Sequence, residues 1–399
     1  MKILYHHRTR SKDGQYVHIS ELIGALRKLG HEVMVVAPAA MERAKFGDDA
    51  GLVALLKRHV PHFAYELMEF GYSLLAYLRL RRAVLTFRPD CLYERYSLFM
   101  PSGVWIKKAF GLPMLLEVNG PLFQERQQHE GGIALQRLAS WSQRYAWQGA
   151  DFVLPVTSVL ADMVLAAGVP KERVSVIPNG IDPERFGNNS LSTQAAKAKL
   201  GLGDRLVLGF TGFVREWHGL DRVVDLVAER ANGSGLHLLI VGDGPARESL
   251  QARARERGIV DRITVTGVVD RDRVPDYVAA FDVALQPAVV PYASPLKLFE
   301  YLAMGRAIVA PATPNLAEVL TDGENALLFD PARPDGMRRA VEKMLNDGEL
   351  RRRVAEGAKR SIVQRKLTWS NNAQRVVDLF DRLLPRAPGT MAARGTGRP

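Results

Sequence analysis

Short apolar runs alternate with amphipathic helical segments along most of the chain, and this alternation limits the fold more than any other feature. The series begins with an apolar run at 2–5, a helical pattern that ends at Gly30, and the second run VMVV. Strands that are apolar on both sides are typical of parallel sheets covered by helices. After the polar stretch GNNSLSTQAAK, a second series runs from RLVLGFTG to AIVAP. The pattern therefore predicts an α/β fold with two Rossmann-like, doubly wound parallel-sheet domains facing each other.

The domain boundaries follow from the same alternation. Residues 1–185 form the first predicted domain and residues 186–366 the second, with the polar stretch as the link between them. Residues 367–385 predict a last amphipathic helix, which we expect to pack back on the first domain. The tail at 386–399 has three arginines, no acidic residue and no apolar periodicity, so we expect it to be disordered.

The composition limits the partners of this protein. A formal charge of +11, from 54 basic and 43 acidic residues, favours nucleic acid, an anionic membrane surface or phosphorylated small molecules. Nucleic acid is disfavoured because no zinc-finger spacing or RNA-binding aromatic motif is present. The single cysteine, Cys91, suits a reducing cytoplasm. Because no apolar run is long enough for a signal peptide or a membrane span, we expect a soluble cytoplasmic protein, or one bound peripherally at the inner face of the membrane.

The stretch SPLKLFEYLAMGRAIVAP predicts a helix, a turn and a buried strand. Ser294 fits the N-cap, Pro295 the first helical position, and Gly305 the residue just past the helix. Lys297 lies in the first turn, where a cation opposes the helix dipole unless an anion binds there. Glu300 follows three residues later, about 4.5 Å along the axis. The alternative to a ligand-binding role is a surface ion pair between Lys297 and Glu300.

Six motifs together resemble the retaining glycosyltransferases of family 4, which have the two-domain GT-B fold. They are GHEVMVVAP, VIPNGIDPERF, GFVREWHGLDRVV, VGDGP, SPLKLFEYLAMGRAIVA and NLAEVLTDGENALLF, and they cover nearly the whole chain. The resemblance implies that the first domain binds an acceptor and the second a nucleoside diphosphate sugar, with UDP as the expected nucleotide. It also implies transfer with retention of anomeric configuration, in which the departing diphosphate helps to accept the acceptor proton.

The resemblance assigns roles to individual residues. Lys297, Arg215 and His218 would face the diphosphate together with the Ser294 helix end, and Glu300 would hold the ribose diol. The residues expected to bind the donor are Gly14, Gly212, Arg215, His218, Gly242, Asp243, Val268, Ser294, Pro295, Leu296, Lys297 and Glu300. The expected catalytic residues are Lys297, Glu300, Arg215, His18 and Asn119.

Four positions depart from the family pattern. Tyr292 stands where members usually carry the first glutamate of an E-x7-E pair near the donor sugar. Phe213 and His218 stand where an arginine and a lysine usually face the diphosphate, so Arg215 and a protonated His218 would have to supply the charge. Asn119 takes the place of a histidine near the transferred sugar, and it cannot act as a general base.

Several motifs also have simple structural explanations. His18 suits a helix cap or the edge of a core, and Arg215 and His218 suit a solvated loop and helix start. The acids of DRD, 270–272, are typical N-caps rather than metal ligands. In VGDGPARES, Arg247 replaces the third glycine of a dinucleotide fingerprint, which argues against NAD. The stretch from Pro178 to Asp182 in VIPNGID more readily shapes a hinge than performs chemistry.

The segment from Ala40 to Leu85 predicts helices that could lie on a membrane. It combines Leu, Phe and Tyr residues with several cations, as interfacial helices do, although two solvated helices covering the sheet would look the same. The cations are Lys57, Arg58, Arg79, Arg81 and Arg82.

These features together predict a transferase that needs no metal, since basic side chains and a helix N-terminus already offset the diphosphate charge. Its acceptor could belong to polysaccharide, glycolipid or glycosylated-metabolite synthesis. Two rival functions stay open: a nucleotide-sugar epimerase of the same fold, and a catalytically degenerate protein that only binds nucleotide sugars.

Overall fold

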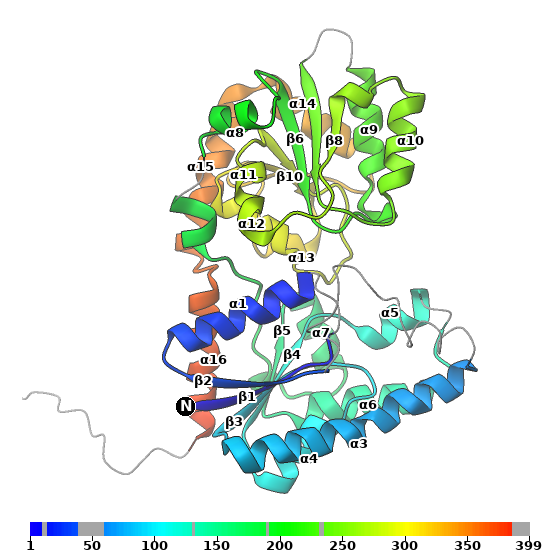
Figure 1. Ribbon diagram of the computed structural model, residues 1–399, viewed down its shortest axis with the longest axis vertical. Helices are drawn as coiled ribbons and strands as arrows, with labels where there is room; N and C mark the ends of the chain where they lie inside the picture. Colours follow the sequence, from blue (N-terminus) through cyan, green and yellow to red (C-terminus); the bar gives the residue numbers. More distant parts are fainter. Residues whose placement is uncertain (10–13, 39–59, 130–131, 189–190, 231–234, 385–399) are drawn as a thin grey trace, which may run out of the picture.

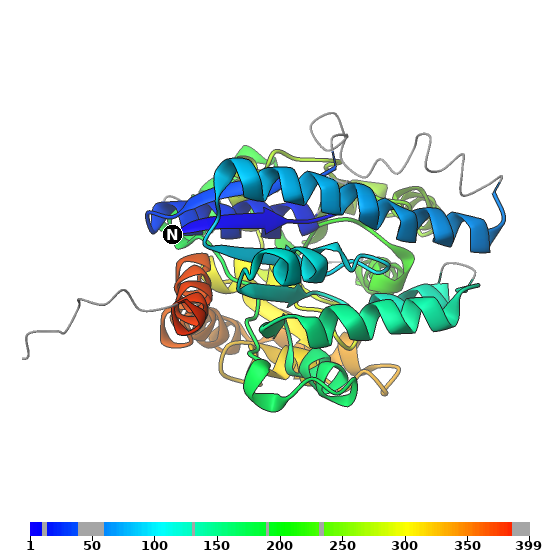
Figure 2. The same ribbon diagram turned by 90° about the horizontal axis from the view of Figure 1, so that it is seen from below.

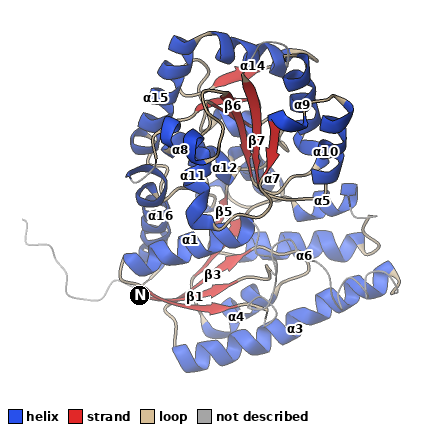
Figure 3. Cartoon of the chain, turned by 45° about the horizontal axis from the view of Figure 1, so that its top comes forward, coloured by secondary structure: helices blue, strands red, loops and turns tan. Residues whose placement is uncertain are grey.

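The computed structural model describes residues 1–9, 14–38, 60–129, 132–188, 191–230 and 235–384. Two α/β domains lie one above the other, and helices cover both faces of each central sheet (Figures 1 and 3). The predicted cations Lys57 and Arg58 and the tail at 386–399 lie outside the described residues.

The first domain contains a five-stranded parallel sheet with the order β2-β1-β3-β4-β5. Alternate strand residues enter two cores: Leu4 and Leu92 face one side of the sheet, and Ile3 and Tyr93 face the other. The elements are β1 (Lys2–His6), α1 (Gly14–Lys28), β2 (Glu32–Val36), α3 (His62–Phe87), β3 (Cys91–Arg95), α4 (Ser102–Phe110), β4 (Met114–Val118), α5 (Leu122–His129), α6 (Gln136–Gly149), β5 (Phe152–Pro155) and α7 (Ser158–Ala166).

The second domain contains a six-stranded parallel sheet with the order β11-β10-β9-β6-β7-β8. Helices α9, α10 and α14 cover one face, and α8, α11 and α12 cover the other. The elements are α8 (Thr193–Lys199), β6 (Leu206–Thr211), α9 (Leu220–Glu229), β7 (Leu236–Val241), α10 (Arg247–Glu256), β8 (Ile263–Val265), α11 (Val274–Val278), β9 (Val283–Leu285), α12 (Leu296–Ala303), β10 (Ala307–Pro311), α13 (Pro314–Ala317), β11 (Leu327–Phe329), α14 (Gly336–Asn346) and α15 (Gly348–Gln364).

The chain passes between the domains twice. The second passage leads from α15 into α16 (Trp369–Leu383), which packs against α1 of the first domain. The two passages pair with each other, because the Ile181 N–H donates to the Leu367 carbonyl and the Trp369 N–H donates to the Ile181 carbonyl, both at 3.2 Å. The hinge therefore consists of two connected strands of chain rather than one.

The polar stretch after the first passage is not a simple link, so that prediction was wrong in part. Its second half forms α8, whose N-terminus is capped by the Ser192 hydroxyl accepting from the Ala195 N–H at 3.2 Å. Ala196 is fully buried in the core of the second domain. A serine cap followed by Ala, Gln and Lys favours a helix, and the polar composition concealed this preference.

Candidate donor and active site

The predicted donor helix is α12, and it begins one residue later than expected. Pro295 precedes its first residue, Leu296, and no side chain caps this end. The prediction that Ser294 caps α12 was therefore wrong: its hydroxyl accepts a hydrogen bond from the Asn179 N–H at 3.3 Å instead. Gly305, at φ 58°, follows the helix as predicted and allows the turn into β10.

Lys297 lies in the first turn of α12 and faces the loop after β6. Its Nζ is 3.6 Å from the centroid of the Phe210 ring, and 3.5 Å from the position that a Cβ on Gly212 would occupy. Burial lowers the pKa of Lys297 to about 7, while the charge of Glu300 acts in the opposite direction. Within the described part of the chain, this ammonium group forms no ion pair. It is a half-buried cation beside a glycine backbone, as an anion site requires.

Glu300 does not pair with Lys297, so the surface ion-pair alternative is wrong. The Glu300 side chain is buried, with Oε2 3.4 Å from the Thr211 hydroxyl, and Oε1 pairs with Arg271. Arg271 lies over the Phe186 ring at 4.6 Å from its centroid. Sequence reasoning missed this partner because Arg271 is 29 residues away, inside the DRD motif.

The DRD motif does not cap its helical turn through a side chain, contrary to prediction. Asp270 precedes the 3₁₀ turn Arg271–Arg273 but makes no capping hydrogen bond. Asp272 is exposed and lies 3.4 Å from the guanidinium of Arg185. Arg271, between the two acids, is the residue of this motif that forms an ion pair with Glu300.

Glycines bring the loops after β6 and β7 into contact beside Lys297. A Cβ on Gly242 would lie 2.1 Å from the Gly212 carbonyl oxygen, and one on Gly244 would lie 2.2 Å from the Val214 carbonyl oxygen. Gly212 and Gly242 also have φ values of 115° and 144°, which favour glycine. These loops therefore expose backbone rather than side chains next to the cation.

Three other predicted donor-site residues of the second domain are partly or fully exposed to solvent. The Asp243 carboxylate accepts from the Arg247 guanidinium at 3.0 Å and from the Gly244 N–H at 2.8 Å. Val268, after β8, has an exposed side chain. Arg215 is exposed as well and stacks over Phe213, with its guanidinium carbon 5.0 Å from the ring centroid.

His218 is a neutral side chain in this structure rather than the predicted cation. It is buried, and its Nδ1 accepts a hydrogen bond from the Arg215 N–H at 3.0 Å. Burial first, and then the charges of Lys297 and Arg215, lower the pKa of His218 to about 3. His218 therefore adds no positive charge to that of Lys297 and Arg215 in this part of the site.

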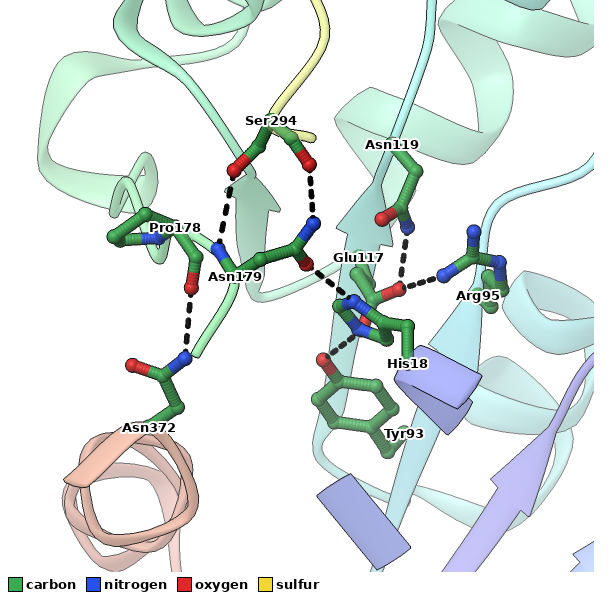
Figure 4. Close-up of polar contacts among 9 residues, drawn as sticks. All are labelled: His18, Tyr93, Arg95, Glu117, Asn119, Pro178, Asn179, Ser294 and Asn372. Atoms are coloured by element: carbon green, nitrogen blue, oxygen red, sulfur yellow. Dashed lines mark hydrogen bonds and ion pairs between the residues drawn. The ribbon is translucent and has the colours of Figure 1, made fainter. Parts of the chain in front are cut away.

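The first domain meets the donor helix at Gly14 and His18. A Cβ on Gly14, the first residue of α1, would lie 3.7 Å from Leu296 Cδ1, so α1 and α12 begin opposite each other. His18 is buried one turn later, with Nδ1 2.6 Å from Asn179 Oδ1 and Nε2 2.8 Å from Glu117 Oε2 (Figure 4). His18 is therefore neither a cap nor an open cleft residue, but a link between α1, β4 and the hinge.

Glu117, at the end of β4, holds the polar cluster together, and sequence reasoning did not assign it a role. Its carboxylate accepts hydrogen bonds from the Arg95 guanidinium at 2.5 Å, from the Tyr93 hydroxyl at 2.6 Å and from the Asn119 amide. Burial acts to raise the pKa of Glu117, but the charges of His18 and Arg95 outweigh it and hold the pKa well below its usual range. Asn119 is thereby held against Glu117 at the end of β4 (Figure 4).

Tyr292, which replaces the usual glutamate, is a contact between the domains. Its carbonyl accepts from the Thr157 hydroxyl at 3.1 Å. Burial and then a hydrogen bond to Glu125 of α5 raise the pKa of its hydroxyl. A carboxylate is therefore present beside this position, supplied by the first domain.

Two family models match the chain in succession. Residues 12–185 match Glycosyltransferase Family 4, and residues 192–361 match Glycosyl transferases group 1. The chain belongs to the family 4 glycosyltransferases. The two matches meet at the hinge, so each of the two sheets of this family 4 chain corresponds to one of the models.

Curated relatives match this family 4 chain over part of its length. An alpha-D-kanosaminyltransferase from Streptomyces kanamyceticus is 28% identical over 63% of this chain and 66% of its own. A 2-deoxystreptamine glucosyltransferase from the same organism is 29% identical over 51% and 54%. A GDP-mannose-dependent alpha-(1-6)-phosphatidylinositol monomannoside mannosyltransferase from Mycobacterium tuberculosis is 27% identical over 63% and 67%. The chain thus spans about half to two thirds of the length of these relatives.

Solved structures agree with the GT-B fold of the family. Anabaena HepE in complex with UDP superposes with a TM-score of 0.71 at 17% identity, over 96% of this chain and 100% of HepE. Sucrose-phosphate synthase from Thermosynechococcus elongatus superposes with a TM-score of 0.74 at 18% identity, over 96% and 99%. At these identities the similarity establishes the architecture, with two Rossmann-like domains, and nothing further.

Proposed function

We propose that this protein is a retaining glycosyltransferase that transfers a sugar from a nucleoside diphosphate sugar, with UDP as the nucleotide, to an acceptor in the cleft. The observation that carries the proposal is Lys297, a cation without an ion-pair partner among the described residues, at the start of α12 and against the backbone of Gly212. Free N–H groups at a helix start and a nearby cation bind phosphate. The UDP in the HepE complex is consistent with this choice of nucleotide.

In the proposed reaction, the diphosphate gains negative charge as the bond to the sugar breaks. Lys297 and the N–H groups at the start of α12 stabilise that charge, and an interaction that strengthens in the transition state raises the rate. Glu300, held by Arg271, accepts hydrogen bonds from the ribose hydroxyls. The acceptor attacks from the face that the diphosphate leaves, and its proton passes to the departing diphosphate. Since these groups already offset the charge, we propose that no metal ion is required.

Ligand binding followed by product analysis tests this function. A panel of nucleoside diphosphate sugars is first screened by thermal shift, because a ligand that binds the native state raises its apparent stability. The best donor is then incubated with the protein, and NMR follows the anomeric configuration of the sugar that forms, with water as the acceptor. We expect UDP release with the α-anomer formed first from an α-linked donor. Initial release of the β-anomer would contradict retention.

The same experiment separates the two rival functions. An epimerase of this fold would convert the donor sugar at C2, whereas a degenerate binding protein would bind UDP and release no sugar. Lys297→Ala distinguishes a catalytic donor site from a merely structural lysine, because it should weaken both UDP binding and release.

A second proposal concerns the membrane, and it rests on the outer face of α3. Five of its apolar side chains are each more than half exposed and recur at intervals of four and seven residues, so they form one stripe along the helix. Leu80 and Val84 on the opposite side enter the core. The stripe consists of Phe63, Leu67, Leu74, Leu78 and Leu85.

Charge around this stripe favours an anionic lipid surface as its partner. Helix α4 lies between α3 and α6 on the same face of the domain (Figure 2). The acids in these three helices are both engaged: Glu66 accepts two backbone N–H groups, and Glu69 pairs with Arg8 and Arg126. The exposed cations are Arg79, Arg81, Arg82, Lys108, Arg137 and Arg144. Exposed leucines, on a face whose exposed cations have no carboxylate partner among the described residues, suit peripheral binding to anionic lipid.

We therefore propose a cytoplasmic protein that associates peripherally with the membrane and acts on an acceptor that is lipid-linked or presented there. No helix among the described residues has the length and apolar character needed to span a bilayer. The relatives include a phosphatidylinositol monomannoside mannosyltransferase and a 2-deoxystreptamine glucosyltransferase, so glycolipid and metabolite synthesis are both compatible with the family.

Flotation with vesicles containing anionic lipid at low salt tests the membrane proposal. The double variant Leu74→Ser with Leu78→Ser should bind at least about tenfold less, since each buried leucine contributes about 1.5–3 kcal/mol. Val363→Ser, at an exposed position on α15, is the matched control and should bind like the wild type. A wild-type protein that does not float at low salt would refute the proposal, and so would equal binding by all three proteins.

A further inference from the structure

The hinge residue Asn179 connects the two domains at the donor helix. Its backbone N–H donates to the Ser294 hydroxyl at 3.3 Å, and its side-chain Nδ2 donates to the Ser294 carbonyl at 2.5 Å. We infer that Asn179 and His18 position the start of α12 for donor binding, so that the first domain orders the donor site of the second. The inference rests on the proposed function, because it assumes that the start of α12 binds the donor diphosphate.

The hydrogen bonds to Ser294 fix the orientation of the Asn179 side chain. With Nδ2 donating to a carbonyl oxygen, Oδ1 must face the other way, and there it lies 2.6 Å from His18 Nδ1. An amide oxygen only accepts, so His18 Nδ1 must carry a proton. Asn179 thus donates toward the second domain and accepts from the first (Figure 4).

The second nitrogen of His18 also faces an acceptor. Nε2 lies 2.8 Å from Glu117 Oε2, and that carboxylate already receives donors from Tyr93 and Arg95. Both ring nitrogens therefore carry protons, and His18 is an imidazolium. The edge of the ring meets Trp369 of α16, with the ring centroids 4.9 Å apart, so packing as well as hydrogen bonding holds it in place.

The chain of contacts ends where α12 begins. Only Pro295, whose φ is fixed by its ring, separates Ser294 from Leu296, the first residue of the helix. Lys297 follows immediately. A shift of Ser294 would therefore move the N–H groups and the ammonium that we assign to the diphosphate, whereas the rest of α12 is held by the core of the second domain.

Asn372 offers a matched control in the same hinge. Its Nδ2 donates to the Pro178 carbonyl at 2.7 Å, one residue before Asn179, but from the side of α16 (Figure 4). In the described part of the chain, its side chain forms no hydrogen bond with Ser294 or α12. Removing the Asn372 side chain takes the bond to the Pro178 carbonyl from the hinge, whereas removing the Asn179 side chain takes the bonds to His18 and to the Ser294 carbonyl.

The experiment compares Asn179→Ala, Asn179→Asp and Asn372→Ala with the wild type. Hydrogen exchange of the segment 294–303 is measured without ligand, and UDP affinity is measured by calorimetry. Asn179→Ala should exchange faster at the start of α12 and bind UDP about tenfold more weakly, since it keeps the backbone hydrogen bond to the Ser294 hydroxyl but loses the side-chain bond to the Ser294 carbonyl. Asn179→Asp keeps the acceptor for His18 but loses the Nδ2 donor, so it should also release α12. Asn372→Ala should match the wild type in both measurements.

The ¹⁵N chemical shifts of the His18 ring supply a second measurement, which a general loss of stability would not change. In the wild type and in Asn179→Asp, both ring nitrogens should have the shifts of a protonated imidazole. In Asn179→Ala, the Nδ1 signal should change while Glu117 still holds Nε2. A neutral His18 in the wild type would overturn the assignment of the link.

The outcomes separate this inference from the proposed function. If the wild type binds UDP and Asn179→Ala shows wild-type exchange and affinity, the inference fails while the function stands. If exchange at the start of α12 rises in Asn179→Ala but the wild type binds no nucleotide, the link is real and the proposed function fails. Equal losses in Asn179→Ala and Asn372→Ala would show a nonspecific hinge effect and would also overturn the inference.

Discussion

The pH dependence of UDP binding follows from the position of Lys297 and tests the assignment of the donor site. Without ligand, burial lowers the pKa of Lys297 to about 7, so much of this side chain is neutral above that pH. A bound diphosphate favours the ammonium form and draws a proton into the site. Affinity for UDP should therefore fall as the pH rises through 7, approaching about tenfold per pH unit at higher pH. Between pH 7.5 and 9 the expected loss is about twentyfold.

Calorimetry measures both the affinity and the proton that accompanies it. At pH 7.5, about 0.8 proton should be taken up for each UDP bound, which buffers of different ionisation enthalpy reveal. The terminal phosphate of UDP, with a pKa near 6, is ionised throughout this range and does not contribute. In Lys297→Arg the side chain stays charged, so its affinity should hardly change between pH 7.5 and 9. If UDP affinity depends on pH equally in the two proteins, or does not change with pH in the wild type, the reasoning is refuted.

Three further predictions concern the ribose contact, the metal requirement and the buried cluster. Glu300→Gln loses its charge-assisted hydrogen bonds, so UDP should bind about tenfold more weakly in calorimetry while inorganic diphosphate is much less affected. Sugar release from the donor should persist after exhaustive chelation, and its loss with recovery on adding Mg²⁺ or Mn²⁺ would contradict the metal-free proposal. Glu117→Gln should lower the free energy of unfolding by about 3 kcal/mol at pH 7, because His18 and Arg95 lose their counter-charge. The pKa of Glu117 is depressed in the folded state, so its contribution is present above about pH 4.5 and lost on acidification; thermal unfolding should show the gap between wild type and variant closing below that pH.

Local sequence determined the elements of the fold and where the donor helix lies. Apolar runs flanked by helical periodicity mark the strands of both sheets, because a strand covered on two faces must be apolar throughout. The sequence SPLKLFEYLAMGRAIVAP likewise specified a helix, a glycine turn and a strand, since these depend on neighbouring residues. Gly212 and Gly242 belong to the same class: their positive φ values are local requirements that few other residues meet.

Only the tertiary structure decided which side chains act together at the site. Glu300 pairs with Arg271 rather than with Lys297, and His18 joins Glu117 and Asn179, which are 99 and 161 residues away. No periodic pattern in the sequence predicts such pairs, because each pair depends on how two strand ends or two domains meet. The charge of His218 was misjudged for the same reason, since burial and the charges of Lys297 and Arg215 lower its pKa. Sequence fixes which groups a segment can offer, while the dielectric surroundings and partners of a buried group exist only after the chain has folded.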